Sequence, residues 1–79
     1  MELTIAGPSH KRVLLAAWFE TYTTRGNLII QPGHAPLIAI LAPHKPLIVC
    51  LKNGKQESLI IAGGILEVNR NHALILMNE

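Results

Sequence analysis

Residues 26–41 read GNLIIQPGHAPLIAIL, two apolar runs joined by a short segment rich in proline and glycine. Pro32 and Pro36 each have a fixed φ and no amide hydrogen to donate to a sheet. Gly33, between them, can adopt the positive φ that tight turns often require. The stretch therefore predicts two β-strands joined by a rigid loop, with His34 and Pro36 presented at the tip of that loop.

Turn-forming clusters divide the rest of the chain at intervals of about 8–12 residues, the spacing typical of an all-β sandwich or barrel. These clusters are Gly7-Pro8, Arg25-Gly26-Asn27, Ala42-Pro43-His44-Lys45-Pro46, Asn53-Gly54, Gly63-Gly64 and Asn69-Arg70-Asn71. Strands are expected at residues 2–5, 11–17, 20–24, 28–31, 37–41, 47–52, 55–62, 65–68 and 73–77. The sequence thus predicts a single domain over residues 1–79, a small antiparallel β-sandwich or flattened barrel.

The local pattern is less simple at three places. Residues 13–19 form an apolar run without alternation, so a buried strand and a helix both fit, and the β-branched and aromatic residues that follow favour a strand. Asn53-Gly54 between two apolar runs predicts a hairpin with a type I′ turn. Gly63-Gly64 interrupts a strand, which predicts either a bulge or the close approach of another backbone.

Apolar residues make up 49% of the chain and charged residues only 15%, against about 25% charged in average proteins. A chain of this size buries only about 60% of its unfolded surface. Residues 37–41 are apolar at every position, although one face of each sheet in a thin sandwich must look outward. A partner that covers this strand is therefore expected, and an unusually apolar but self-sufficient domain is the alternative.

Seven basic and five acidic residues give a net charge of +2, and the scattered basic residues disfavour nucleic acid as a partner. The aromatic residues Trp18, Phe19 and Tyr22 are not interleaved with basic ones, as a base-stacking groove requires. The single Cys50 cannot form an internal disulfide, which favours an intracellular protein. The longest apolar run is far shorter than the ~20 residues of a membrane-spanning helix, and no signal-peptide pattern opens the chain.

Residue types capable of catalysis or metal binding lack the spacing that either chemistry needs. The four histidines form no close pairs with one another or with Cys50, so a zinc site is not expected. Cys50 lies in an apolar run, where burial makes a thiol unreactive. The glutamates show no paired spacing, and no glycine-rich phosphate-binding motif occurs. No catalytic residue, cofactor or metal site is therefore expected.

Two stretches, Gln31-Pro32-Gly33-His34-Ala35-Pro36-Leu37 and Ala62-Gly63-Gly64-Ile65-Leu66-Glu67-Val68, resemble the signature segments of the epsilon subunit of F-type ATP synthases. The resemblance extends in order and spacing from about Gly26 to Met77, and it concerns the N-terminal β-sandwich domain of that family. It implies the same fold, with two packed sheets in a flattened barrel. It also implies a non-catalytic subunit of the central stalk, or rotor, that couples proton flow to ATP synthesis.

The resemblance further implies a peripheral location at the cytoplasmic face of a bacterial inner (plasma) membrane, with no direct insertion into the membrane. The partners would be the gamma subunit of the stalk and the ring of membrane c subunits. The gamma contact would comprise His34, Ala35, Pro36, Leu37, Ile38 and Ala39. The ring contact would comprise Arg25, Gly26, Asn27 and His34, at the same end of the molecule as the loop. Gly33, Gly63 and Gly64 would have a backbone role only.

The chain departs from the family pattern in three ways. Asn27 replaces an acidic residue, which puts a polar contact with the ring in doubt, and Pro43-His44-Lys45-Pro46 replaces a Pro-Gly turn. The 79 residues stop before the C-terminal helical hairpin of typical relatives, so neither inhibition of ATP hydrolysis nor ATP binding is expected of them. A short form and a piece of a longer chain both fit. A stand-alone β-sandwich module with an unrelated partner is the alternative function.

Overall fold

The computed structural model describes residues 1–78, and within them it contains eight β-strands and no helix. The strands are β1 (Glu2–Ala6), β2 (Lys11–Thr23), β3 (Gly26–Ile30), β4 (His34–Leu41), β5 (Lys45–Leu51), β6 (Gln56–Ile61), β7 (Gly64–Arg70) and β8 (His72–Met77). The all-β class predicted from the turn spacing is confirmed.

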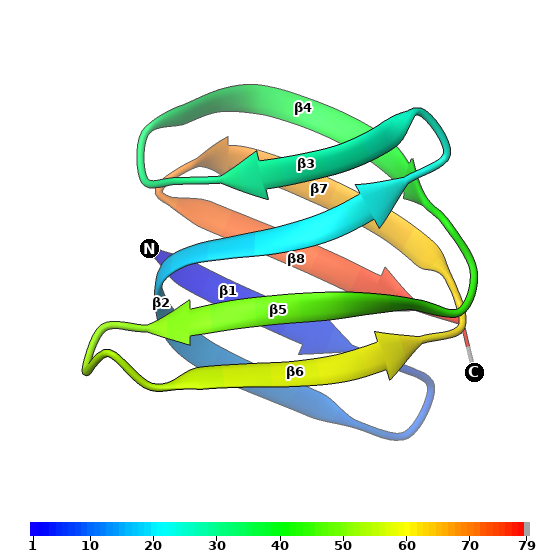
Figure 1. Cartoon of the computed structure of the whole chain (residues 1–79), viewed down its shortest axis with the longest axis horizontal. Helices are drawn as coiled ribbons and strands as arrows, with labels where there is room; N and C mark the ends of the chain where they lie inside the picture. Colours follow the sequence, from blue (N-terminus) through cyan, green and yellow to red (C-terminus); the bar gives the residue numbers. More distant parts are fainter. Residues whose placement is uncertain (79) are drawn as a thin grey trace.

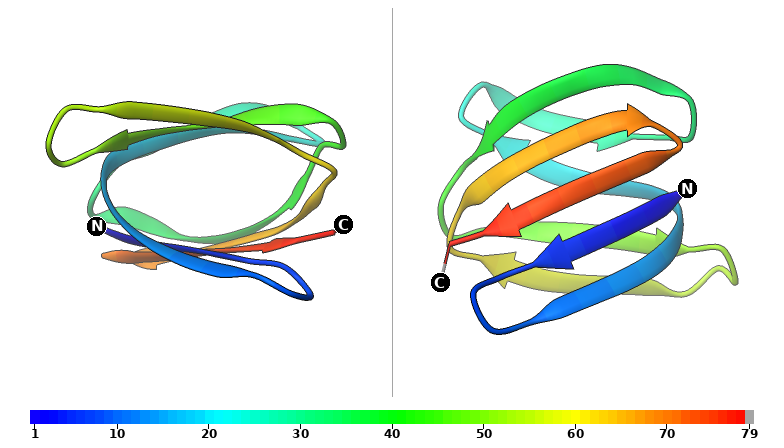
Figure 2. Two further views of the ribbon diagram at one scale, coloured as in Figure 1. Left: turned by 90° about the horizontal axis from the view of Figure 1, so that it is seen from below. Right: turned by 180° about the vertical axis from the view of Figure 1, so that it is seen from behind.

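The strands form one continuous sheet that folds into a flattened barrel of two layers (Figure 1 and Figure 2). The front layer in Figure 1 contains β3, the second half of β2, β5 and β6. The back layer contains β4, β7, β8, β1 and the first half of β2. Each layer therefore has one side toward the interior and one side toward solvent.

The pairing of β1 with β8 is parallel, whereas the expected sandwich was antiparallel throughout. Parallel neighbours need a long crossover connection. The remainder of the fold provides that connection here, because β1 and β8 are the first and the last strand. Their register sets Leu3 beside Ala73 and Ile5 beside Ile75, which places four buried apolar side chains together.

Strand β2 belongs to both layers because it bends near Ala17. The register of β2 against β5 skips this residue, which forms a β-bulge, and bulges bend the strand that carries them. The extra residue shifts the alternation of side chains, so that Ala16 and Phe19 are both buried. This shift explains why residues 13–19 lack a period of two, and it confirms that they form a strand.

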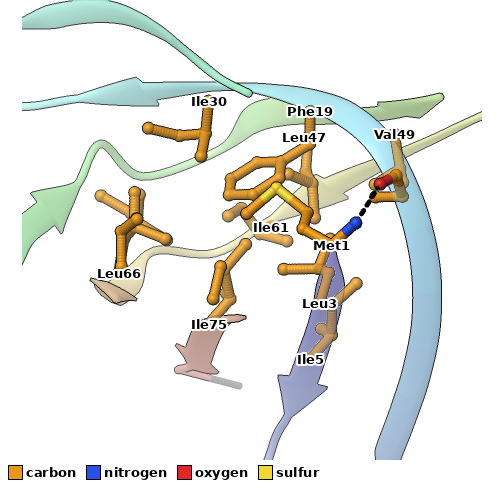
Figure 3. Packing of buried hydrophobic residues seen from close by; sticks show 14 residues of the cluster. Met1, Leu3, Ile5, Phe19, Ile30, Leu47, Val49, Ile61, Leu66 and Ile75 are labelled. Atoms are coloured by element: carbon orange, nitrogen blue, oxygen red, sulfur yellow. Dashed lines mark hydrogen bonds between the residues drawn. The ribbon is translucent and has the colours of Figure 1, made fainter. Parts of the chain in front are cut away.

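One cluster of buried apolar side chains, drawn from every strand, fills the space between the layers. The largest fully buried apolar members are Phe19, Leu3, Ile30, Leu47, Leu66, Ile75, Val49 and Val68 (Figure 3). The amino group of Met1 donates a hydrogen bond to the carbonyl oxygen of Ala16, and the Ala16 N–H donates one back to Met1, both at 2.8 Å. These bonds attach the start of β1 to the bend of β2.

The connection between β5 and β6 is a hairpin, as predicted, but its turn type differs. The Leu51 N–H donates a hydrogen bond to the Lys55 carbonyl oxygen (2.7 Å), which leaves Lys52, Asn53 and Gly54 as the loop. Among these, only Gly54 has a positive φ (92°), whereas a type I′ turn needs a positive φ at both central residues. The type I′ prediction is wrong, and the turn is a three-residue loop with glycine in the left-handed position.

Gly63 lies between β6 and β7 and Gly64 begins β7, where the chain crosses from the front layer to the back layer (Figure 1). Gly64 has a φ of 151°, and a Cβ built on it would overlap the carbonyl oxygen of Leu76 on β8. Gly63 has a φ of 126°, and its Cβ would meet other atoms only at ordinary van der Waals distances. Of the two explanations offered by the sequence, the close approach of another backbone holds at Gly64.

We expect Gly64→Ala to lower the free energy of unfolding by about 3–5 kcal/mol, because it adds a steric overlap to the strain of a φ that non-glycine residues avoid. Gly54→Ala is the matched control, since Gly54 also has a positive φ but nothing lies within 4 Å of its Cβ position. The free energy of unfolding of that control should fall by about 1–2 kcal/mol. Urea denaturation of both variants measures the difference, and equal losses would contradict the close-approach explanation.

Thr21 on β2 is fully buried, and its hydroxyl has no hydrogen-bond partner. We expect Thr21→Val to raise the free energy of unfolding by about 1 kcal/mol, because it removes an unsatisfied polar group without changing the shape of the side chain. Thr23→Val should instead lower the free energy of unfolding, because it removes two hydrogen bonds. The Thr23 hydroxyl donates to the Gly26 carbonyl oxygen and accepts from the Arg25 N–H, both at 3.0 Å. Thermal melting of the two variants tests both signs.

Candidate protein-docking surface

The solvent-facing side of the back layer is largely apolar. We call this surface the outer apolar face, and its exposed large apolar side chains are Val13, Leu15, Ile38, Ile40, Ile65 and Leu76. The β4 residues are the most exposed, with Ile38 at 74% and Ile40 at 63%. The front layer exposes only Ile29 and Ile60 among large apolar residues in the described part of the chain. The two layers therefore differ in how much apolar surface they leave uncovered.

Side chains of β4 alternate between this face and the interior, which divides the expected gamma contact. Ile38 and Ile40 point outward, whereas Leu37 and Ala39 pack against the core. The expectation that Leu37 and Ala39 belong to a contact surface is not supported by their orientation, because the core already occupies their side chains. The run of five apolar residues thus reflects a strand whose inner side is buried and whose outer side is not.

The proline-rich segment is a shorter loop than the sequence suggested. Pro32 and Gly33, whose φ is 82°, make the turn, and His34 already begins β4, with its N–H donating to the Gln31 carbonyl oxygen (3.1 Å). Between His34 and Leu37 the register of β4 against β7 shifts. Ala35 and Pro36 lie in this β-bulge and are exposed. Because proline cannot donate to the ladder, a bulge at Pro36 is the arrangement that a sheet tolerates.

The expected ring contact, Arg25, Gly26, Asn27 and His34, is spread over the length of β3. The turn at Arg25 and Gly26 joins β2 to β3, whereas His34 follows the far end of β3, which spans about 16 Å (Figure 1). The expectation that these residues share one end of the molecule is wrong. They share a side instead, because β3 runs between the two turns and has a hydrogen-bonded partner only in β2.

Several members of the outer apolar face were not anticipated. Ile40 could have been found from the alternation that begins at Ile38, but Val13, Leu15, Ile65 and Leu76 lie on other strands. They join the face through the registers that set Ile40 beside Ile65 and Ile65 beside Leu76. Sequence alone does not give the order of strands in a sheet, so no local signal could have assembled this set.

Reactive and ligand-type side chains are dispersed. Residues 1–78 contain no group of three or more His, Cys, Asp or Glu side chains that could hold a metal ion. Cys50 is half-buried on β5, with its thiol near the Leu51 carbonyl oxygen (3.7 Å). His72 pairs with Glu2 (Nε2–Oε1 3.3 Å), and Arg12 pairs with Glu57 (3.0 Å). In the same range, no helix is long and apolar enough to span a membrane.

The sequence profile of the family described as "ATP synthase, Delta/Epsilon chain, beta-sandwich domain" matches residues 16–79. The chain belongs to this family. Over 51 residues it is 45% identical to the ATP synthase epsilon chains of Acinetobacter baumannii and Acinetobacter baylyi. That match covers 65% of the chain and 36% of each relative, so the chain is similar to little more than a third of their length.

Solved structures of ATP synthase contain the same fold. The chain is similar to a subunit in the Euglena gracilis mitochondrial ATP synthase, in a structure of OSCP, F1 and c-ring, with a TM-score of 0.84 and 26% identity over 98% of this chain and 49% of that one. It is also similar to a subunit in the central stalk and c-ring structure of the Tetrahymena thermophila mitochondrial enzyme. There the TM-score is 0.83 and the identity 21%, over 100% of this chain and 63% of that one, which shows the fold alone.

The opposite orientations of two neighbouring residues on β4 give a test of this epsilon-family surface. We expect Leu37→Ala to lower the free energy of unfolding by about 2 kcal/mol, because it leaves a cavity at the edge of the core. Ile38→Ala should cost at most about 1 kcal/mol, because an exposed position loses strand propensity and little packing. Chemical denaturation separates the two, and a larger loss for Ile38→Ala would show that the alternation is assigned the wrong way round.

Proposed function

We propose that this chain is a non-catalytic rotor subunit of a proton-translocating F-type ATP synthase. It binds the gamma subunit through the outer apolar face and contacts the c-ring along the side formed by β3 and β4. It transmits rotation between ring and stalk, and it is held at the cytoplasmic face of a bacterial inner membrane by these partners.

The outer apolar face is the observation that carries the gamma contact. Six large apolar side chains on one side of one layer are exposed, and exposed apolar surface that gathers on one face marks interaction sites in soluble proteins. Membership of the Delta/Epsilon family of ATP synthase supports another subunit of that enzyme as the partner. His34, Ala35 and Pro36 border this face at the bulge of β4, so they belong to the proposed contact together with Ile38.

The side formed by β3 and β4 fits the ring contact, because it extends from the turn at Arg25 to His34. A flat partner laid along this side meets Arg25, Gly26, Asn27 and His34 together. Asn27 donates a hydrogen bond to the Glu20 carboxylate (Nδ2–Oε2 2.7 Å). Its amide is therefore held in place on the surface of the front layer. Similarity to subunits in structures that contain F1 and a c-ring supports this neighbourhood.

Binding to the gamma subunit from the same genome, measured by isothermal titration calorimetry, tests the proposal. We expect Ile40→Asp to weaken the complex at least about tenfold, because it places a carboxylate in the middle of the apolar contact. Ile60→Asp is the matched control, since Ile60 is exposed to nearly the same extent (65% against 63%) but lies on the front layer. That variant should bind within about twofold of the wild type.

A folded chain that forms no complex with gamma would overturn the rotor assignment. The outer apolar face would then need another partner, as expected of a stand-alone β-sandwich module. If Ile40→Asp and Ile60→Asp weaken the complex equally, gamma is still the partner, but the contact does not lie on the back layer.

A further inference from the structure

Two carboxylates lie on the outer apolar face: Glu2 on β1, which pairs with His72, and Glu67 on β7. Glu67 on β7 lies between Leu74 on β8 and Ile38 on β4 in the strand register, and Ile65 precedes it on the same side of its own strand. Its side chain is exposed, and no residue among 1–78 forms an ion pair or hydrogen bond with it. Apolar side chains therefore surround an unpaired negative charge.

No cationic side chain among residues 1–78 forms an ion pair with Glu67, and this includes Arg70 at the end of the same strand. The His72 ring at the beginning of β8 pairs with Glu2 rather than with Glu67. Lys11 lies on β2, three strands away from β7 in the order of the back layer. The chain therefore supplies no counter-ion to Glu67 from within its described residues.

A shallow hollow opens beside Glu67 where β4 bulges away from β7. It is lined by Pro36, Leu37, Ile38, Glu67, Val68 and Asn69. The register shift between His34 and Leu37 places this hollow next to the bulge. Asn69 is exposed and its side-chain amide has no partner among residues 1–78, so two free polar groups meet two apolar side chains, Pro36 and Ile38, at one site.

Any partner that covers Ile38, Ile65 and Leu76 also removes water from Glu67. An ionised carboxylate that loses water without gaining a donor is strongly unfavourable, so the covering surface must bring a hydrogen-bond donor to it, and a cationic donor offsets the charge best. An arginine fits this site best, because its aliphatic stem packs on apolar groups while its planar guanidinium donates to a carboxylate and an amide oxygen.

We infer that Glu67, Asn69 and Pro36 form a receptor site for a single arginine side chain of the docked partner. The inference rests on the proposed function, in which that partner is the gamma subunit. Glu67 then fixes the position of the partner on the back layer, because a partner docked in a shifted position would bury the carboxylate against apolar groups.

Titration of the gamma subunit with Glu67→Gln tests this site, because the variant keeps the size of the side chain and removes only its charge. We expect the dissociation constant to rise at least about 30-fold, and Glu67→Lys to raise it further through repulsion of the arginine. The wild-type complex should weaken with added salt, and the Glu67→Gln complex should lose part of that dependence. Glu20→Gln on the front layer is the matched control and should bind like the wild type.

The outcomes separate this inference from the function on which it rests. If wild type and Glu67→Gln bind gamma with affinities within about twofold of each other, the arginine site is overturned and the rotor assignment stands. If the folded wild-type chain does not bind gamma at all, the arginine site and the rotor assignment are both overturned. Unchanged melting temperatures of the Glu67 variants, expected because the carboxylate has no partner among residues 1–78, exclude unfolding as the cause of weaker binding.

Discussion

The bulge at Ala17 is the constraint on which both surfaces of this domain depend. Strand β2 is hydrogen-bonded to β1 in the back layer and to β3 and β5 in the front layer, and only a bent strand can serve both. The bulge shifts the alternation of side chains within a single run, so that Ala16 and Phe19 both enter the core. Without this shift, a strand that buries Ala16 would direct Phe19 to solvent and Glu20 to the core.

A sandwich of this size has one interior and two outer faces, and its apolar residues exceed what the interior holds. The core takes one side of every strand, with Gly64 allowing β7 to approach β8 closely where the chain changes layers. Most of the surplus gathers on the back layer, and among the large apolar residues of 1–78 only Ile29 and Ile60 are exposed on the front one. An uneven distribution of this kind makes physical sense for a subunit that is attached to a larger assembly by one face.

The bulge in β4 performs a second task on that face. It accommodates Pro36, which cannot donate to the ladder, and it opens the hollow beside Glu67. The bulge that accommodates Pro36 in the sheet therefore also shapes the outer apolar face. The prolines and glycine of this segment predict a rigid loop, but most of the segment is strand. The residues that the family resemblance implies for the gamma contact are divided between the outer apolar face and the core.

The sequence by itself determined the all-β class, the positions of the turns and the need for glycine at the junction of β6 and β7. These follow from local chemistry: the fixed φ of proline, the freedom of glycine, and the alternation of apolar residues. The family is indicated separately, by the resemblance of residues 31–37 and 62–68 to its signature segments. Only the tertiary structure decided which strands are neighbours. The parallel pairing of β1 with β8, the opposite orientations of Leu37 and Ile38, and the meeting of Ile40, Ile65 and Leu76 all depend on contacts between distant segments. Register across a sheet is set by packing between strands, and no single strand carries that information.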